Sequence, residues 1–163
     1  TRFILSFNAM DPIVMEDGTE WITTQVVGQS FLLNQIRKMV SLAIEVARGT
    51  ATTDVVHYAI GRGKKMRVGM APAQGLFLEM SDFHLYNQHK TKPDEIPDLD
   101  WMTNTVSPAA QRIEQFKMEV ILKQILEQEQ VEGNFIKYLY EMEAVFKWKE
   151  HYLTGDGHRL WKK

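Results

Sequence analysis

Arg37 is the residue whose placement raises the clearest chemical question, because it lies inside an apolar stretch that has the spacing of a helix. In a helix over 31–48, Arg37 falls at the border of the apolar face. A guanidinium held away from water needs a carboxylate or phosphate to accept its N–H donors, because an unpaired buried charge is strongly destabilising. Either such a partner comes from elsewhere, or Arg37 reaches solvent or bridges to Glu45 or Asp54. The spacing alone leaves both interpretations open.

Composition and spacing argue against several other kinds of site. The chain has no cysteine, which excludes disulfides, thiol nucleophiles, iron–sulfur clusters and cysteine-ligated zinc. Its 5 histidines show no zinc-ligand spacing, and no Gly-x-Ser-x-Gly nucleophile motif occurs. The run Gly61-Arg62-Gly63-Lys64-Lys65 lacks the spacing and the Ser or Thr of a phosphate-binding loop. We therefore expect no metal site and no complete active site in this sequence.

The charge is unevenly distributed along the chain. Its formal net charge is −2, yet residues 31–70 contain seven basic and two acidic residues. A basic segment in a mildly acidic protein favours one face that meets an anion, whereas a uniformly basic chain would favour wrapping around nucleic acid. A solvated loop whose charges contact nothing is the alternative.

Several elements must position these residues. Two runs rich in β-branched and aromatic residues predict a pair of strands joined by a long loop with an Asp17-Gly18 turn. Ser30 is a candidate helix cap, and Gly49 and Gly133 are candidate helix ends. The predicted strands cover 2–10, 21–29 and 76–83, and the predicted helices cover 31–48, 54–60, 108–132 and 134–150.

The predicted organisation has four parts. The composition, with 44% hydrophobic residues, is that of a globular chain, and its apolar runs are too short to cross a bilayer. The chain opens inside an alternating apolar run, which suggests a fragment of a longer protein. We predict a first segment over 1–88, a linker over 89–106, a helical extension over 107–153 and a flexible tail over 154–163.

Two motifs resemble those of a known enzyme family. Residues 28–40, followed by Ala71-Pro72-Ala73-Gln74-Gly75-Leu76, resemble the C-terminal half of the TruA-like tRNA pseudouridine synthases. The run Gln35-Ile36-Arg37-Lys38-Met39-Val40 is most similar to their eukaryotic branch. The resemblance covers about residues 2–88, and the predicted helices over 107–150 resemble the extra C-terminal helices of eukaryotic members.

The resemblance implies a fold and an activity. The fold is α+β: half of a catalytic domain with a mixed, mainly antiparallel sheet flanked by helices, followed by a C-terminal helical hairpin. The reaction detaches uracil from its ribose, rotates it and rejoins it through carbon 5, with no cofactor and no metal. By resemblance, Arg37 pairs with the catalytic aspartate, and Leu76 with Gly75 lines the uridine pocket. The expected phosphate contacts are Lys38, Arg62, Lys64, Lys65 and Arg67.

The sequence also departs from the family pattern. The Arg-Thr-Asp-x-Gly motif that carries the aspartate is absent, so the aspartate is expected outside this chain, and the isolated chain is expected to be inactive. Asn34 stands where many members have histidine, and Ser41 stands where glycine is usual. Both departures concern contacts of the helix that carries Arg37.

The resemblance also sets expectations about partners. We expect tRNA and the N-terminal half of the same catalytic domain as partners, with no membrane association, and we make no prediction of oligomeric state. Nuclear localisation is expected, with the mitochondrion as the alternative. Two other functions stay open: a non-catalytic RNA-binding module, and a helical scaffold that docks onto a protein.

Overall fold

The computed structural model describes residues 2–61, 68–91, 95–99 and 107–148. It divides into two compact units, one formed by Thr1–Ala73 with Phe135–Lys163 and the other by Gln74–Asn134. Both helices and antiparallel strands are present, which confirms the predicted α+β class.

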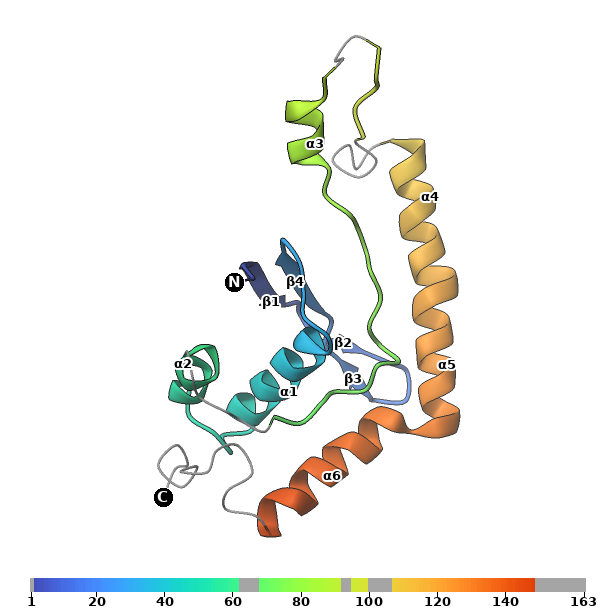
Figure 1. The fold of residues 1–163 in the computed structure, drawn as a ribbon. Coiled ribbons are helices and arrows are strands. Elements are labelled where there is room, and N and C mark those ends of the chain that lie inside the picture. Colours follow the sequence, from blue (N-terminus) through green and yellow to red (C-terminus); the bar gives the residue numbers. More distant parts are fainter. Residues whose placement is uncertain (1, 62–67, 92–94, 100–106, 149–163) are drawn as a thin grey trace. The chain divides into compact units, whose positions relative to one another are not determined.

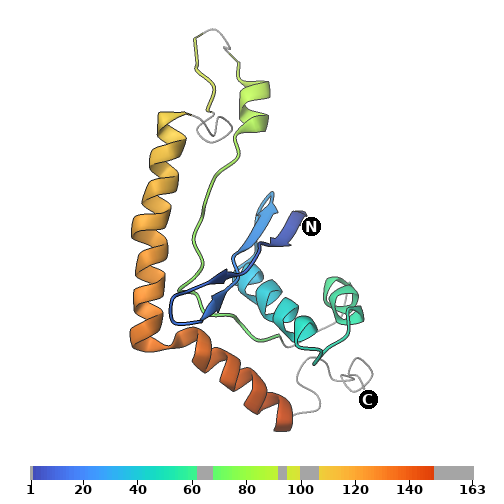
Figure 2. The same cartoon turned by 180° about the vertical axis from the view of Figure 1, so that it is seen from behind.

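The first unit contains two small antiparallel sheets. Strand β1 (Ile4–Ala9) pairs with β4 (Thr24–Gly28), and the short strands β2 (Ile13–Val14) and β3 (Glu20–Trp21) pair within the connection between them (Figures 1 and 2). Gly18 takes the positive φ of 83° that this turn requires. The predicted strand pair with its long loop and its turn is therefore confirmed.

Helix α1 (Gln35–Ala47) begins later than predicted. Asn34 adopts the left-handed conformation, with φ 59°, which ends any helix that would start at Phe31. Ser30 does not cap α1, because the helix begins five residues later, at Gln35. The Ser30 hydroxyl instead accepts a hydrogen bond from Arg2 at 2.8 Å. The predicted start and cap of this helix were wrong, whereas its predicted end at Gly49, which has φ 72°, is confirmed.

Helix α2 (Asp54–Ile60) has the predicted bounds and packs against α1. Leu42, Ala51 and Val55 form the buried cluster between them, and the half-buried Val46 and Val68 pack against it. This small core fixes the C-terminal end of α1 in the first unit.

Helix α6 (Asn134–Trp148) contributes a second set of contacts to the first unit. The Tyr138 hydroxyl lies 2.7 Å from the hydroxyl of the fully buried Ser41 on α1. The ring of Phe135 meets Trp21 edge to face, with centroids 5.4 Å apart. Ser41, one of the two departures from the family pattern, is thus hydrogen-bonded to α6, and Arg48 at the end of α1 adds a second bond to the Leu139 carbonyl at 3.3 Å.

The second unit is built around one long helical run. It consists of α4 (Pro108–Phe116), the π-helical turn η1 (Lys117–Leu122) and α5 (Lys123–Glu132). The Ser107 hydroxyl caps α4 by accepting the Ala110 N–H at 3.1 Å, and Gly133 ends α5 with φ 61°. The predicted helix over 108–132 is confirmed, with a widened turn that the sequence pattern did not indicate.

The predicted strand over 76–83 was wrong. These residues are extended but form no strand, because no other strand in the described part of the chain supplies backbone partners. The segment instead runs beside the α4–η1–α5 helix in both views (Figures 1 and 2).

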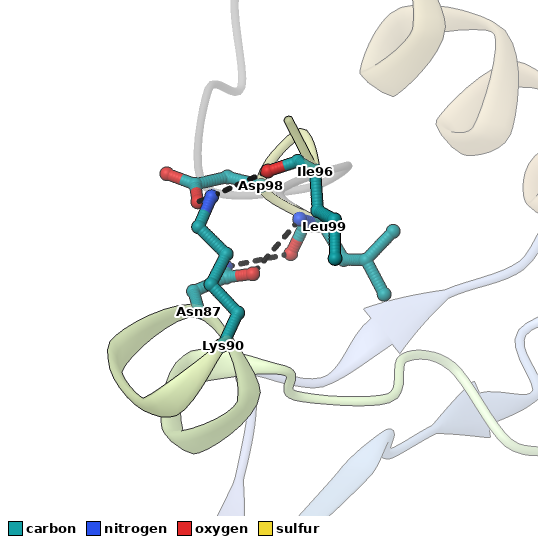
Figure 3. A network of polar contacts seen from close by, with 5 residues as sticks. All are labelled: Asn87, Lys90, Ile96, Asp98 and Leu99. Carbon is teal, nitrogen blue, oxygen red and sulfur yellow. Dashed lines mark hydrogen bonds and ion pairs between the residues drawn. The ribbon is translucent and has the colours of Figure 1, made fainter. Parts of the chain in front are cut away.

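A short helix that the sequence did not predict, α3 (His84–His89), follows this segment. The Asn87 side chain donates to the Leu99 carbonyl at 3.1 Å and accepts the Leu99 N–H at 2.9 Å (Figure 3). The Lys90 ammonium donates to the Ile96 carbonyl at 2.7 Å and pairs with Asp98. These contacts order residues 95–99 against α3. No helix in the described part of the chain is both long and apolar enough to cross a membrane.

Candidate functional site

Arg37 is half-buried on α1 and is held by the Ala71 backbone through two hydrogen bonds of opposite direction. Its Nε donates to the Ala71 carbonyl at 2.6 Å, and its own carbonyl accepts the Ala71 N–H at 3.2 Å. Ala71 itself is buried. The side chain and the backbone of one arginine thus join α1 to the Ala71-Pro72 segment.

Asn34 provides the third contact of Arg37. The Asn34 Oδ1 accepts a hydrogen bond from Nη1 of Arg37 at 3.3 Å. Asn34 has the left-handed conformation and directly precedes α1, so the Asn34 side chain lies one turn before Arg37 on the same face. Asn34, which stands where family members often have histidine, therefore helps to orient the guanidinium.

With respect to the described residues, the Arg37 guanidinium keeps unused hydrogen-bond donors. Arginine has five N–H donors, and two of those of Arg37 are used by Ala71 and Asn34. Among the described residues, Arg37 forms no ion pair with an acidic side chain, and the expected alternatives, Glu45 and Asp54, do not pair with it. The Arg37 guanidinium is therefore a positioned, half-buried cation that can form a bidentate ion pair with a carboxylate.

Glu45 has a separate environment at the end of α1. It is 2% exposed, and its Oε2 lies 2.6 Å from the Thr50 hydroxyl, whereas its Oε1 has no partner among the described residues. Burial raises the pKa of Glu45, although the Thr50 hydrogen bond and the charge of Arg48 act in the opposite direction. Glu45 is therefore a buried carboxyl group that the candidate site does not use.

Gly75 and Leu76 lie at the start of the second unit, whereas Arg37 lies in the first. Both Gly75 and Leu76 are exposed, and 46% of Leu76 is accessible. An exposed leucine in an extended segment is available to an apolar ligand surface, as the resemblance requires.

The residue before them, Gln74, was not among the predicted site residues. Its Nε2 donates to the Ile125 carbonyl at 3.1 Å, and its Oε1 accepts from Nδ2 of Asn134 at 2.6 Å. Both partners are more than 50 residues away in sequence, so no local pattern could have indicated them.

A second attachment follows Leu76 along the chain. The Lys117 ammonium contacts Glu79 at 2.9 Å and Glu114 at 2.6 Å. Partial burial alone would lower the pKa of Lys117, but the hydrogen bonds to Glu114 and Glu79 raise it. Lys117 is therefore charged at neutral pH and ties the extended segment to η1.

The structure locates only part of the predicted basic surface. Lys38 is exposed on α1, directly after Arg37. Arg62, Lys64, Lys65 and Arg67 lie outside the described residues. Within the described ranges, no group of three or more His, Asp or Glu residues is arranged to hold a metal ion.

Comparison with known proteins identifies a family match and several relatives. The tRNA pseudouridine synthase family model matches residues 6–84. The chain is 34% identical over 156 residues to tRNA pseudouridine synthase 1 of Schizosaccharomyces pombe, and 36% identical over 156 residues to the human pseudouridylate synthase 1 homolog. It is 42% identical over 88 residues to tRNA pseudouridine synthase 1 of Saccharomyces cerevisiae.

These matches cover the chain and its relatives to different extents. The alignments with the S. pombe and human proteins each cover 96% of this chain, but only 28% and 35% of those relatives. The S. cerevisiae alignment covers 53% of this chain and 16% of that relative. The chain thus spans about a third or less of the length of each relative.

Proposed function

We propose that this chain, whose residues 6–84 match the tRNA pseudouridine synthase family model, is part of an enzyme that isomerises uridine to pseudouridine in tRNA. In this proposal the chain supplies the arginine partner of a catalytic aspartate that lies outside it. The aspartate belongs to the N-terminal half of the same catalytic domain, which is the proposed protein partner of this segment.

The observation that carries this proposal is the state of Arg37. Ala71 and Asn34 fix its guanidinium, and among the described residues three of its N–H donors remain unused and no acidic side chain pairs with it. A half-buried cation of this kind favours a carboxylate supplied from elsewhere. In the proposed enzyme, Arg37 holds the aspartate ionised and oriented toward the ribose of the target uridine.

The proposed reaction is an isomerisation that needs no external reactant. The bond between ribose C1′ and N1 of uracil breaks, a bond between C1′ and C5 forms, and the C5 proton departs while N1 gains one. The uracil must leave its stack to turn over, so it needs a dry surface to rest against. Leu76, exposed beside Gly75, is the proposed surface.

The proposed RNA contacts are electrostatic. Lys38 is exposed next to Arg37, and Arg62, Lys64, Lys65 and Arg67 follow in the sequence. Such residues bind backbone phosphates and position the RNA without reading its sequence.

We propose that the enzyme is located in the nucleus, with the mitochondrion as the alternative location.

The test measures release of tritium from C5 of uridine in bulk tRNA. It compares the 163-residue chain with the parent protein, meaning the full-length natural protein that contains it. Release by the parent protein and not by the chain supports the proposal. Release by neither protein overturns the enzyme, and tRNA titration then separates an RNA-binding module from a protein-docking scaffold. Release by the short chain overturns the external position of the aspartate.

A further inference from the structure

The segment that carries Leu76, residues 76–83, is extended. Residues 76–83 form no strand, and Leu76 and Leu78 are 46% and 78% exposed. An extended segment without a hydrogen-bonded ladder has little intrinsic rigidity. Within the described residues, side chains that fasten the segment to the adjacent helices are therefore the contacts that can place Leu76.

Gln74 is the attachment nearest to Leu76, and its amide is used at both ends. The Ile125 carbonyl can only accept a hydrogen bond, so the Gln74 end that lies 3.1 Å from it must be the NH2 group. The other end, Oε1, must then accept from the NH2 group of Asn134 at 2.6 Å. The opposite amide orientation would face donor with donor and acceptor with acceptor.

Asn134 is itself fixed by a second hydrogen bond. Its Nδ2 also donates to Oε2 of Glu132 at 2.6 Å, so both hydrogens of its amide are used. Asn134 follows Gly133, whose left-handed conformation ends α5 and places Asn134 at the first position of α6. The Gln74 side chain is therefore attached to the N-terminal part of α5, at Ile125, and to Asn134 at the corner that follows the helix, through a chain of satisfied polar groups.

A further attachment lies on the other side of Leu76. Glu79 pairs with Lys117 at 2.9 Å, on the π-helical turn η1. Leu76 thus lies between two points at which the extended segment is tied to the α4–η1–α5 helix, two residues after one and three before the other.

From these contacts we propose that Gln74 and Asn134 are positioning residues, which hold Gly75 and Leu76 in the conformation that receives the target uracil. The inference rests on the proposed function, because it assumes that Leu76 contacts the uracil. Neither residue is proposed to touch the substrate. Their contribution is to remove conformational freedom from a segment that must be placed within a fraction of an ångström.

The test uses the parent protein and its Gln74→Leu, Gln74→Glu and Asn134→Leu variants. Gln74→Glu keeps the side-chain shape but cannot donate to Ile125, and it serves if Gln74→Leu does not fold. Gln115→Leu is the matched control, because Gln115 is an exposed glutamine of the same unit whose side chain donates to Glu119 on the next turn of its own helix. Two readouts are measured: single-turnover tritium release at saturating tRNA, and chymotryptic cleavage within residues 76–80.

The expected result separates positioning from binding and from bulk stability. Gln74→Leu and Asn134→Leu should each lower the single-turnover rate at least about tenfold and leave the tRNA dissociation constant within about twofold of the parent value. The double variant should be no slower than the slower of the two single variants, because both substitutions remove the Gln74–Asn134 hydrogen bond. Cleavage within 76–80 should accelerate in these variants and stay unchanged in Gln115→Leu.

Three outcomes would overturn the inference. A rate within twofold of the parent value in folded Gln74→Leu or Gln74→Glu would show that the contact is only structural. Rate reductions that simply add in the double variant would show that Gln74 and Asn134 act independently. Unchanged cleavage would show that the conformation of residues 76–80 does not depend on Gln74 and Asn134. The cleavage measurement remains informative even if the parent protein releases no tritium. Absence of tritium release would contradict the proposed function instead.

Discussion

Arg37 and Ala71 are joined by two hydrogen bonds that run in opposite directions, one from the arginine side chain and one to its backbone. The pair fixes the guanidinium relative to the Ala71-Pro72 segment before any substrate is present. A catalytic group that is already ordered does not have to lose conformational freedom when the reaction occurs. In a synthase of the proposed kind, the fixed guanidinium of Arg37 would in turn fix the orientation of the catalytic aspartate.

Replacing Arg37 by lysine should reduce activity strongly in the parent protein. Lysine keeps the charge but lacks the planar fork and the Nε donor that binds the Ala71 carbonyl. We expect kcat for pseudouridine formation to fall about a hundredfold or more, with a much smaller change in tRNA affinity. Single-turnover kinetics and tRNA titration measure the two effects separately.

Arg112→Lys provides the control for this substitution. Arg112 is an exposed arginine on α4 with no role in the proposed site, so the same exchange should leave kcat unchanged. Full activity in Arg37→Lys would contradict the role assigned to the guanidinium fork. A reduction of equal size in both variants would point instead to general sensitivity to arginine exchange.

Leu76→Ser should weaken catalysis because it replaces an apolar surface with a hydroxyl. Removing a side-chain contact of this size from an apolar pocket corresponds to about 10- to 200-fold in kcat/KM. Leu78→Ser is the matched control, since Leu78 is 78% exposed in the same extended segment and has no proposed contact with uracil. Equal kcat/KM in the two variants would remove Leu76 from the proposed pocket.

Local sequence signals predicted the elements that depend on neighbouring residues. The strands β1 and β4, the bounds of α2 and the Ser107 cap all follow from side chains within a few positions. The start of α1 did not, because the left-handed conformation of Asn34 is a backbone choice that a helical apolar pattern does not reveal. The failed strand over 76–83 shows that apolar, β-forming residues become a strand only where a partner strand is present.

The candidate site also has features that local sequence signals predict and contacts that they do not. The position of Arg37 at the border of an apolar helix face could be predicted, because helical spacing alone sets it. Its partner Ala71 is 34 residues away and contributes only backbone atoms, which any residue type except proline can provide in full. The Gln74–Asn134 contact joins two side chains, but they are 60 residues apart, so no local sequence signal could indicate it.

Replacing Lys64, Lys65 and Arg67 together by alanine should weaken tRNA binding and flatten its salt dependence. A protein that neutralises fewer phosphates displaces fewer counterions from the RNA, so the slope of log affinity against log salt should decrease by about 2. Filter binding of labelled tRNA at several salt concentrations measures the slope. Alanine at Arg112 and Lys123, two exposed cations on α4 and α5, is the control and should leave it unchanged. A slope that does not change in the triple variant contradicts phosphate contact by these residues.

The carboxyl group of Glu45 should make stability depend on pH in the direction opposite to that of a salt-bridged carboxylate. Burial raises the pKa of Glu45 in the folded protein above its unfolded value, which is about 4.3. Between these two pKa values the folded state binds more protons than the unfolded state, so the free energy of unfolding falls as pH rises. The stabilisation from Glu45 is complete below the unfolded pKa and is lost as pH rises through the folded pKa.

Glu45→Gln tests this prediction, because an amide of the same shape cannot ionise. Its Nε2 can donate to the Thr50 hydroxyl, which then donates to the backbone carbonyl of residue 45, 2.7 Å away. The melting temperature of the variant minus that of the parent protein should therefore increase from pH 4 to pH 8. Thr50→Val removes the hydroxyl that is hydrogen-bonded to the Glu45 carboxyl group, and it should lower the free energy of unfolding by about 1–3 kcal/mol at neutral pH. A melting-temperature difference that stays constant with pH would show that Glu45 titrates at its ordinary value.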